Sequence, residues 1–254
     1  MSSAAVTWGI AERSVKLIPR VPSTFIPSLV MPVFFTVAFS GPFASLVDIP
    51  GFPADHILDW VVPFTALQGC AFAGVTTGMG IARDLESGFY DRMLMSPAPR
   101  AALLMGAFLA TVLRATIALI LMLLVGVVAG AHFREGIVGI ATLAVAGLGL
   151  ALAAGAWAIG LALRFKTQQI TPLMQTGIFL STFLSTAQMP VELMTWWFDN
   201  VARLNPVTYV LALARQGFLG DVTWEVTQEG LLALAGMILV LATFATRSMK
   251  KVIP

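Results

Sequence analysis

The sequence predicts an all-α integral membrane protein with six transmembrane helices. Of its 254 residues, 58% are hydrophobic and only 11% are charged, whereas a soluble domain contains about 25% charged residues. The charged residues are confined to short clusters between long apolar blocks, which is how a bilayer partitions a chain. No internal repeat and no low-complexity linker divides residues 1–254, so we expect a single transmembrane domain.

Six apolar blocks are candidates for the membrane spans. A helix needs about 20 residues to cross the hydrocarbon core, and most of the blocks reach this length. The first block begins after Val21 and contains Pro27 and Pro32, so we do not expect a cleavable signal peptide. The six blocks are residues 24–47, 60–82, 101–131, 136–163, 170–189 and 231–246.

The distribution of Lys and Arg predicts the orientation. With six spans, both termini share one side of the membrane with the loops at 83–100 and 164–169. That side holds most of the basic residues, namely Arg13, Lys16, Arg20, Arg83, Arg92, Arg100, Arg164, Lys166, Arg247, Lys250 and Lys251. The other side holds only Arg134, Arg203 and Arg215. The positive-inside rule therefore places both termini in the cytoplasm of a multi-pass plasma-membrane protein.

Residues 1–20 are expected to form an amphipathic helix in the cytoplasmic interface. Apolar residues recur there every three or four positions, and the charged residues fall between them. Such a helix lies in the plane of the membrane with its apolar face toward the lipid. The apolar positions are Ala4, Trp8, Ala11, Val15 and Ile18.

Residues 83–100, RDLESGFYDRMLMSPAPR, form the most charged stretch of the chain and follow the second predicted span. Leu85, Phe89 and Met93 are spaced for one face of a short helix, which needs a partner or the membrane to cover it. Gly88 interrupts the run, and Pro97 and Pro99 close it. The interleaved charges are Arg83, Asp84, Glu86, Asp91 and Arg92.

Residues 190–220, on the predicted outer side, are apolar for a loop and include Trp196 and Trp197. Asn205-Pro206 predicts the start of a helix, because Asn is a preferred cap and Pro is favoured in the first turn. Arg215 lies inside this helix. A seventh span here would move the basic C-terminus outside, so we predict a re-entrant or interfacial pair of helices.

The chain carries no recognisable catalytic or metal-binding motif. It has no phosphate-binding loop of the G-x-x-x-x-G-K-[ST] type and no H-E-x-x-H or G-x-S-x-G sequence. Cys70 is the single cysteine, and His56 and His132 have no ligand partner at metal spacing. The basic residues form no continuous stripe, which argues against nucleic-acid binding. We expect neither an enzyme nor a bound cofactor.

Polar residues inside the spans allow two interpretations. Arg114 lies in the middle of span 101–131, where facing lipid costs about 2.5–3.5 kcal/mol. It is expected to contact either a substrate or partner subunit, or the polar groups of neighbouring helices. Gln68 and Thr76 form a weaker polar pattern in the second span. A polar face in the fifth span consists of Thr171, Gln175, Thr182, Ser185 and Gln188.

This polar face either lines a translocation path, together with Gln68 and Arg114, or supplies hydrogen bonds between helices. Two glycine pairs, Gly74/Gly78 and Gly126/Gly130, allow helices to approach closely. Their spacing does not distinguish packing inside the chain from a dimer interface.

The whole chain resembles the ABC-2 type permeases, the membrane subunits of ABC exporters. Residues 83–100 are similar to the family segment R-x-x-x-x-G-x-x-[DE]-x-[LM]-x-x-[ST]-P-x-x-R, and LNPVTYVLALARQGFLG at 204–220 is similar to N-P-[LV]-x-[YW]-x-x-x-x-x-R. Within the family the chain looks most like the daunorubicin-type drug-resistance exporters, with support from GAHFREGIVG at 130–139.

The resemblance implies roles for the two matching segments. It implies that Arg83, Asp84, Glu86, Gly88, Asp91 and Arg92 form a coupling helix that docks on an ATP-binding subunit. It implies an outer gate that includes Asn205, Pro206, Tyr209 and Arg215, to which we add Trp196 and Trp197. ATP and Mg are then expected on the partner subunit and not on this chain.

The expected function is that of a permease which pairs with a second permease chain, identical or paralogous, and with ATP-binding subunits. It would export a small hydrophobic or amphipathic compound, such as a drug or a lipid, from the cytoplasm or inner leaflet. Two alternatives stay open at this point. One is an ABC-2 permease for a polysaccharide or lipid-linked glycan, and the other is a motor-independent secondary carrier.

Overall fold

The computed structural model describes residues 2–95 and 98–251, and within these ranges it contains helices and no strand. The predicted all-α class is therefore confirmed. The α-helices are α1 (Ser3–Arg20), α2 (Pro22–Ser40), α3 (Ile57–Glu86), α4 (Phe89–Leu94), α5 (Arg100–Ala129), α6 (Gly136–Phe165), α7 (Thr171–Phe183), α8 (Trp196–Leu204), α9 (Pro206–Leu219) and α10 (Trp224–Lys251). Short 3₁₀ turns are η1 (Ala44–Asp48), η2 (Gln168–Ile170) and η3 (Val191–Leu193).

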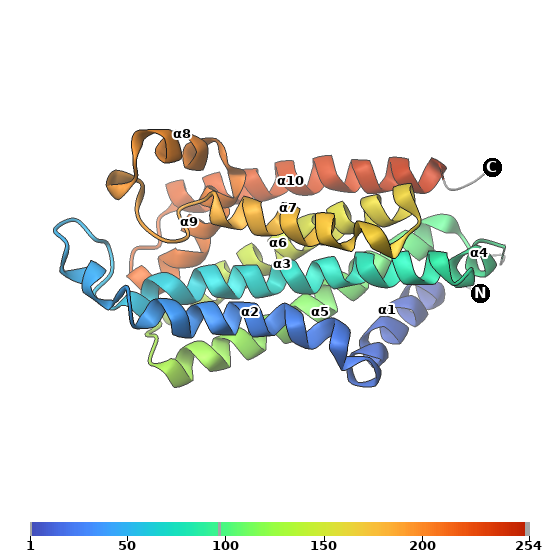
Figure 1. The fold of residues 1–254 in the computed structure, drawn as a ribbon, viewed down its shortest axis with the longest axis horizontal. Coiled ribbons are helices and arrows are strands. Elements are labelled where there is room, and N and C mark those ends of the chain that lie inside the picture. Colours follow the sequence, from blue (N-terminus) through green and yellow to red (C-terminus); the bar gives the residue numbers. More distant parts are fainter. Residues whose placement is uncertain (1, 96–97, 252–254) are drawn as a thin grey trace.

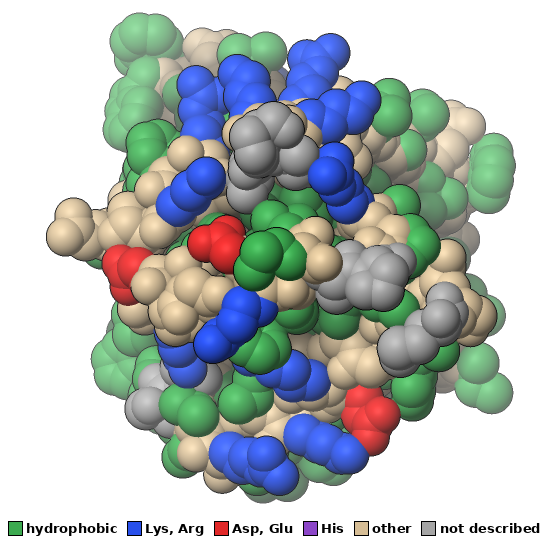
Figure 2. Space-filling view, turned by 90° about the vertical axis from the view of Figure 1, so that its right-hand side faces the viewer, with side chains coloured by type: hydrophobic (Ala, Val, Ile, Leu, Met, Phe, Trp, Pro, Cys, Tyr) green, Lys and Arg blue, Asp and Glu red, His purple; other side chains and the backbone are tan. Residues whose placement is uncertain are grey.

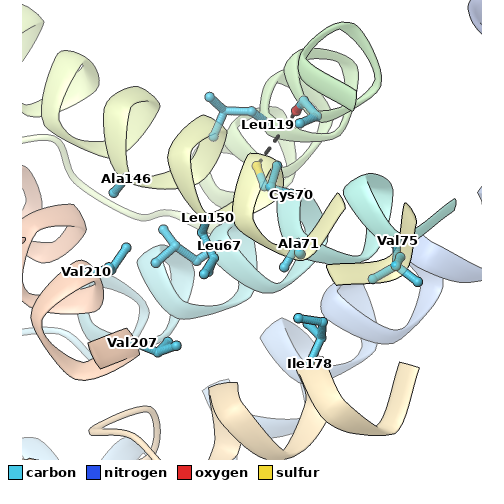
Figure 3. Packing of buried hydrophobic residues seen from close by; sticks show 14 of the residues in the cluster. Leu67, Cys70, Ala71, Val75, Leu119, Ala146, Leu150, Ile178, Val207 and Val210 are labelled. Carbon is cyan, nitrogen blue, oxygen red and sulfur yellow. Dashed lines mark hydrogen bonds between the residues drawn. The ribbon is translucent and has the colours of Figure 1, made fainter. Parts of the chain in front are cut away.

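Helix α3 is the centre of the bundle. The most apolar 18-residue stretch of α3 is 100% buried, because α2, α5, α6, α7 and α9 pack around it. Figure 3 shows the contact layer, in which Leu67 of α3 lies beside Leu150 of α6, and Cys70 of α3 lies near Leu119 of α5. The Cys70 thiol is buried and donates to the Ala115 carbonyl, with 3.7 Å between Sγ and O.

The outer faces of the long helices are apolar and exposed. Val128 of α5 is 88% exposed, Ile137 of α6 is 85% exposed, and Leu239 of α10 is 71% exposed. In water such large apolar surfaces are unfavourable, whereas lipid covers them without cost. The chain is thus a multi-pass membrane protein by the length and the apolar surface of its helices.

Four described helices, α3, α5, α6 and α10, are long and apolar enough to cross a membrane. A fifth span is reached if α1 and α2, which are bent by 70°, are counted as one broken span. Helix α7 has 13 residues and is therefore about 20 Å long, which is shorter than the roughly 30 Å hydrocarbon core. The count of six spans stays a prediction.

Two predicted blocks are longer than the helices that occupy them. The block at 24–47 ends as α2 at Ser40, before Gly41-Pro42, where proline removes a backbone donor. The block at 170–189 ends as α7 at Phe183. From there an irregular segment, residues 184–195, leads to α8.

Both termini and α4 lie at one end of the molecule, and α8 and the 41–56 loop lie at the other (Figure 1). We call these the α4 end and the α8 end. Lys and Arg side chains gather on the α4 end, which faces the viewer in Figure 2. This placement agrees with the predicted common side for the termini and the loop at 83–100. Which side of the membrane it faces stays a prediction.

Helix α1 lies against α5 at the α4 end. Ile10 and the Thr7 carbonyl stand where a side chain on Gly106 of α5 would be, and Thr7 Oγ1 donates to the Ala102 carbonyl at 3.3 Å. Trp8 points away from this contact and is exposed. An exposed Trp next to a packed face suits a helix at a membrane interface, which stays the prediction for α1.

The glycine pair Gly74/Gly78 packs inside the chain. A Cβ atom on Gly74 would lie 2.4 Å from the Ala151 carbonyl oxygen of α6, and one on Gly78 would lie 2.5 Å from the Ala158 carbonyl carbon. Gly126 likewise approaches Val62 of α3. The structure therefore uses the close-approach glycines of α3 for its contact with α6.

Candidate functional site

The charged segment at the α4 end is built around a sharp turn. Helix α3 ends at Glu86, and Gly88 has φ +68° before α4 begins at Phe89. This left-handed conformation costs other residue types about 1–2 kcal/mol, so glycine is favoured at this position. The turn brings the predicted coupling residues together on one end of the molecule. Ser96 and Pro97 of the segment lie outside the described residues.

Two of the predicted coupling carboxylates are bound inside the chain. Arg13 of α1 donates to both Asp84 oxygens, from Nη1 at 2.7 Å and from Nη2 at 3.0 Å. Glu86 accepts from Thr167 Oγ1 at 2.9 Å and from the Gln168 backbone N–H at 3.0 Å. These groups tie α1 and η2 to the end of α3, so they hold the segment in place.

Asp91 and Arg92 of α4 are exposed and form no ion pair among the described residues. The Arg92 guanidinium lies 5.8 Å from the centre of the Phe89 ring, and the Arg13 guanidinium lies 4.2 Å from it. The predicted apolar stripe faces the protein, because Leu85 is buried and Met93 packs against the core. The exposed charges are therefore presented by an anchored helix.

Tyr90 attaches α4 to α10. Its side chain is 4% exposed, and its hydroxyl lies 3.8 Å from the Met249 sulfur of α10. Burial, with a smaller contribution from the charge of Asp84, raises the pKa of Tyr90, so the phenol stays neutral at every physiological pH. The contact links the last turn of α10 to the first turn of α4.

A cavity of about 470 Å³ opens between α2, α3 and α7. This volume falls within the range of small-molecule sites, which are mostly apolar with a few polar groups. We call it the central cavity. Its lining is Pro27, Ser28 and Met31 from α2, Phe72, Val75, Thr76 and Met79 from α3, and Gln175, Thr176 and Phe179 from α7.

Of the predicted path residues, Gln175 lines the central cavity and the other four do not. Thr182 and Ser185 are buried and donate to carbonyls of their own segment. Because α7 ends at Phe183, the predicted polar face does not continue to Ser185 and Gln188. Gln68 is 0% exposed, and neither of its amide atoms has a partner in the described chain.

Arg114 is bonded to two neighbouring helices. Its Nη1 donates to Thr76 Oγ1 of α3 at 2.8 Å, and its Nη2 donates to the Ser14 carbonyl of α1 at 2.8 Å. These contacts match the interpretation of Arg114 as a residue that joins helices. It reaches the central cavity only through Thr76, whose side chain lines that cavity.

The polar residues of the sequence did not predict the apolar lining of the central cavity. Phe72, Thr76 and Met79 recur at i, i+4 and i+7, which places them on one face of α3. This spacing was the available signal, but the apolar members could not be distinguished from lipid-facing or core residues without the positions of α2 and α7.

Arg215 of α9 clamps the segment that follows α7. It is 3% exposed, and it donates from Nη1 to the Thr186 carbonyl at 2.6 Å and from Nη2 to the Ala187 carbonyl at 2.9 Å. Its guanidinium also stacks over the Trp60 ring at 3.4 Å. Buried backbone carbonyls need such partners, because an acceptor without one is unfavourable away from water.

Asn205 joins two helix ends. Its side-chain oxygen accepts from the Val207 backbone N–H at 3.0 Å and caps α9. Its side-chain nitrogen donates to the Ser181 carbonyl at 2.7 Å and to the Leu184 carbonyl at 2.8 Å, at the end of α7. The Asn205 side-chain amide therefore holds the C-terminal end of α7 against the start of α9.

Tyr209 completes the turn between α8 and α9, since its hydroxyl donates to the Arg203 carbonyl at 3.0 Å. Pro206 occupies the first position of α9, as its fixed backbone angle favours. Trp196 and Trp197 begin α8 and are exposed at the α8 end. The predicted outer residues thus divide into a bonded corner and an exposed aromatic pair.

We expect Asn205→Ala to lower the free energy of unfolding by about 2 kcal/mol, since it removes a helix cap and two bonds to half-buried carbonyls. Thermal unfolding of the purified chain in detergent measures the loss. Asn200→Ala, on exposed α8, serves as the control, because its amide bonds only to the Trp196 carbonyl of its own helix. Equal midpoints for the two variants would contradict the joining role of Asn205.

Comparison with known proteins places the chain in a family. A family model described as "ABC-2 family transporter protein" matches residues 53–247. The probable doxorubicin resistance ABC transporter permease protein DrrC of Mycobacterium tuberculosis is 27% identical over 196 residues, which cover 77% of this chain and 70% of that protein.

Two further relatives carry related names. The daunorubicin resistance ABC transporter permease protein DrrB1 of Streptomyces coeruleorubidus is 24% identical over 242 residues, covering 92% of this chain and 82% of that protein. The probable multidrug ABC transporter permease YbhR of Escherichia coli is 24% identical over 162 residues, covering 62% and 42%. Because the family model matches most of this chain, residues 53–247, the chain belongs to the ABC-2 family of transporter proteins.

Proposed function

We propose that this chain is the membrane-spanning permease subunit of an ATP-driven exporter. It works with separate ATP-binding subunits and a second permease chain, and it moves a hydrophobic or amphipathic compound out of the cytoplasm or the inner leaflet. Family membership and the names of the relatives support the transporter class. The substrate class and the assembly are our proposal.

The observation that carries the proposal is α4, which presents Asp91 and Arg92 at the end of the molecule where both termini lie. Helix α4 is fixed by Gly88, Tyr90 and the bonds of Asp84 and Glu86, so a push on its exposed face moves the end of α3. The sequence has no phosphate-binding loop of its own. Charged pairs on a rigid helix suit docking to a complementary partner surface.

The central cavity is the proposed route. Helix α3 forms one wall and also continues to the charged segment, so a movement of α4 reaches the cavity directly along one rigid element. Phe72, Met79 and Phe179 offer apolar contact, and Thr76 and Gln175 offer hydrogen bonds. This mixture favours an amphipathic compound over a glycan, whose hydroxyl groups need many more polar partners.

The proposed topology keeps the six spans. Helices α2 and α7, which run lengthwise in Figure 1, are the two spans added to α3, α5, α6 and α10. Helix α7 crosses only part of the bilayer, and the segment held by Arg215 and Asn205 completes its path. Both termini are then cytoplasmic, α1 is interfacial, and α8 with α9 forms the outer re-entrant segment.

The test is the double variant Asp91→Ala/Arg92→Ala, expressed in the native host. We expect the yield of a co-purified P-loop ATPase to fall about tenfold or more, because the exposed charges that meet it are gone. Transport falls with it, while the thermal midpoint of the chain is unchanged. Asp84 is left intact, since its loss would also release Arg13 and α1.

The matched control is Asp199→Ala/Arg203→Ala, which removes a neighbouring Asp and Arg from α8 at the opposite end. This variant should retain the ATPase. A chain that transports normally without any nucleotide-binding partner would contradict the proposal and favour a motor-independent carrier.

A further inference from the structure

A second, smaller cavity lies beneath α1, between α1, α3, α4 and α5. Its volume is about 70 Å³, which exceeds the roughly 30 Å³ that one water molecule occupies in the liquid. Three basic residues, Arg13, Arg83 and Arg114, line it together with one acidic residue, Asp84. We call it the α1 cavity. It belongs neither to the central cavity nor to the exposed charges of α4, although Thr76 borders both cavities.

Two residues that line the α1 cavity each carry a buried donor without a partner among the described residues. The Arg114 Nε and the Thr77 hydroxyl are buried and unbonded in the described chain, and both residues are 5% exposed. Buried polar groups nearly always have a hydrogen-bond partner, so two orphans at one cavity indicate a group that fills it. Both orphans can donate, so the missing group is an acceptor.

The charge of the cavity is also unbalanced. Both Asp84 oxygens accept from Arg13, so the single carboxylate is already paired. Arg83 and Arg114 form no ion pair among the described residues. A buried guanidinium without a counter-charge is unfavourable, because desolvation is not offset by an opposite charge.

We propose that the α1 cavity binds one phosphate-sized oxyanion, held by the Arg114 Nε, the Thr77 hydroxyl and the charge of Arg83. A guanidinium matches the geometry of phosphate oxygens, and charge-assisted bonds of this kind are strong. The chemistry is the same for inorganic phosphate and for a phospholipid headgroup. The cavity lies under α1 at the α4 end, where basic side chains gather (Figure 2).

An anion at this place joins three elements of the bundle. Arg114 belongs to α5, Thr77 and Arg83 belong to α3, and the roof is α1 with Ser14 and Arg13. Binding therefore tightens α1 against the end of α3. The prediction is an anion-dependent stability of the chain that exposed basic residues elsewhere do not share.

The test uses the purified full chain in a non-ionic detergent, with its thermal midpoint followed by Trp fluorescence. Inorganic phosphate is titrated against chloride at constant pH and ionic strength. In parallel, short-chain phosphatidylglycerol is compared with the matching diacylglycerol, which lacks the phosphate. We expect a saturable rise of the midpoint, with Thr77→Val shifting the half-maximal concentration about tenfold higher and Arg114→Met abolishing the response.

Arg247→Met is the control, since Arg247 is an exposed basic residue of α10 at the same end. It should respond like the unaltered chain. Thr77→Val breaks no hydrogen bond of the described chain, so it decides the outcome if Arg114→Met does not fold.

The two probes separate the sources of the anion. A response to phosphate assigns a free ion, and a response to phosphatidylglycerol but not to phosphate or diacylglycerol assigns a lipid headgroup. No response to either probe, or an unchanged titration in Thr77→Val, would overturn the proposal and leave a water-filled cavity.

Discussion

Arg215→Met is expected to lower the free energy of unfolding by about 4 kcal/mol, the largest effect of any single change considered. The Thr186 and Ala187 carbonyls each lose a buried donor, and an unsatisfied buried acceptor costs about 1–3 kcal/mol. The methionine side chain keeps most of the apolar volume, so the loss reports on hydrogen bonds and on the stacking over Trp60.

Thermal unfolding in detergent measures this effect, and Arg203→Met provides the matched control. Arg203 is another Arg of the segment 190–220, but it is exposed and pairs with Asp199 on the surface, where such a pair contributes about 0–1 kcal/mol. Arg215→Lys is expected to recover part of the loss, because one ammonium reaches fewer of the carbonyls than the planar guanidinium. Equal midpoints for Arg215→Met and Arg203→Met would refute the stabilising role of the bonds from Arg215 to the Thr186 and Ala187 carbonyls.

Gly74→Ala is expected to destabilise the chain by about 3 kcal/mol. Its new Cβ would lie 2.4 Å from the Ala151 carbonyl oxygen, and a backbone atom cannot rotate away as a flexible side chain can. Helices α3 and α6 must then separate, which breaks the largest interface of the bundle. Overpacking of this kind typically costs about 1–3 kcal/mol, and occasionally more.

The control for Gly74→Ala is Gly236→Ala. Gly236 lies in the middle of α10 and has no atom within 4 Å of a Cβ placed on it. Alanine is the better helix former by about 1 kcal/mol, so this variant should be as stable as the original chain or more stable. A comparison of fluorescence midpoints tests both. If Gly74→Ala folds with an unchanged midpoint, the packing of α3 against α6 is not as close as described.

The sequence was sufficient for features that depend on local pattern. The apolar blocks predicted the long helices α3, α5, α6 and α10, and Asn205-Pro206 predicted the start of α9. The stripe of Leu85, Phe89 and Met93 predicted one short helix; α4 holds Phe89 and Met93, whereas Leu85 lies in the last turn of α3. Each of these signals lies within a few residues of the structure that it specifies.

Pairings between distant residues could not be predicted in the same way. The bond between Arg13 and Asp84 joins residues 71 positions apart, and it changes Asp84 from a candidate partner contact into an internal one. The end of α7 depends on Asn205, which is 21 positions beyond Leu184. Spacing along the fifth span therefore predicted a continuous polar face that the helix does not have.

The central position of α3 in the bundle has a consequence for how the protein is made. Among the 18-residue apolar stretches of the four long helices, that of α3 has the lowest mean hydropathy, whereas that of α10 is only 17% buried. Helices leave the translocon according to their hydrophobicity, and α3 is synthesised before the α5 and α6 that surround it. It must therefore wait in the bilayer with the Gln68 side chain uncovered, or be retained beside the translocon until those neighbours arrive. Biogenesis of this chain should thus be most vulnerable in the interval between the synthesis of α3 and that of α6.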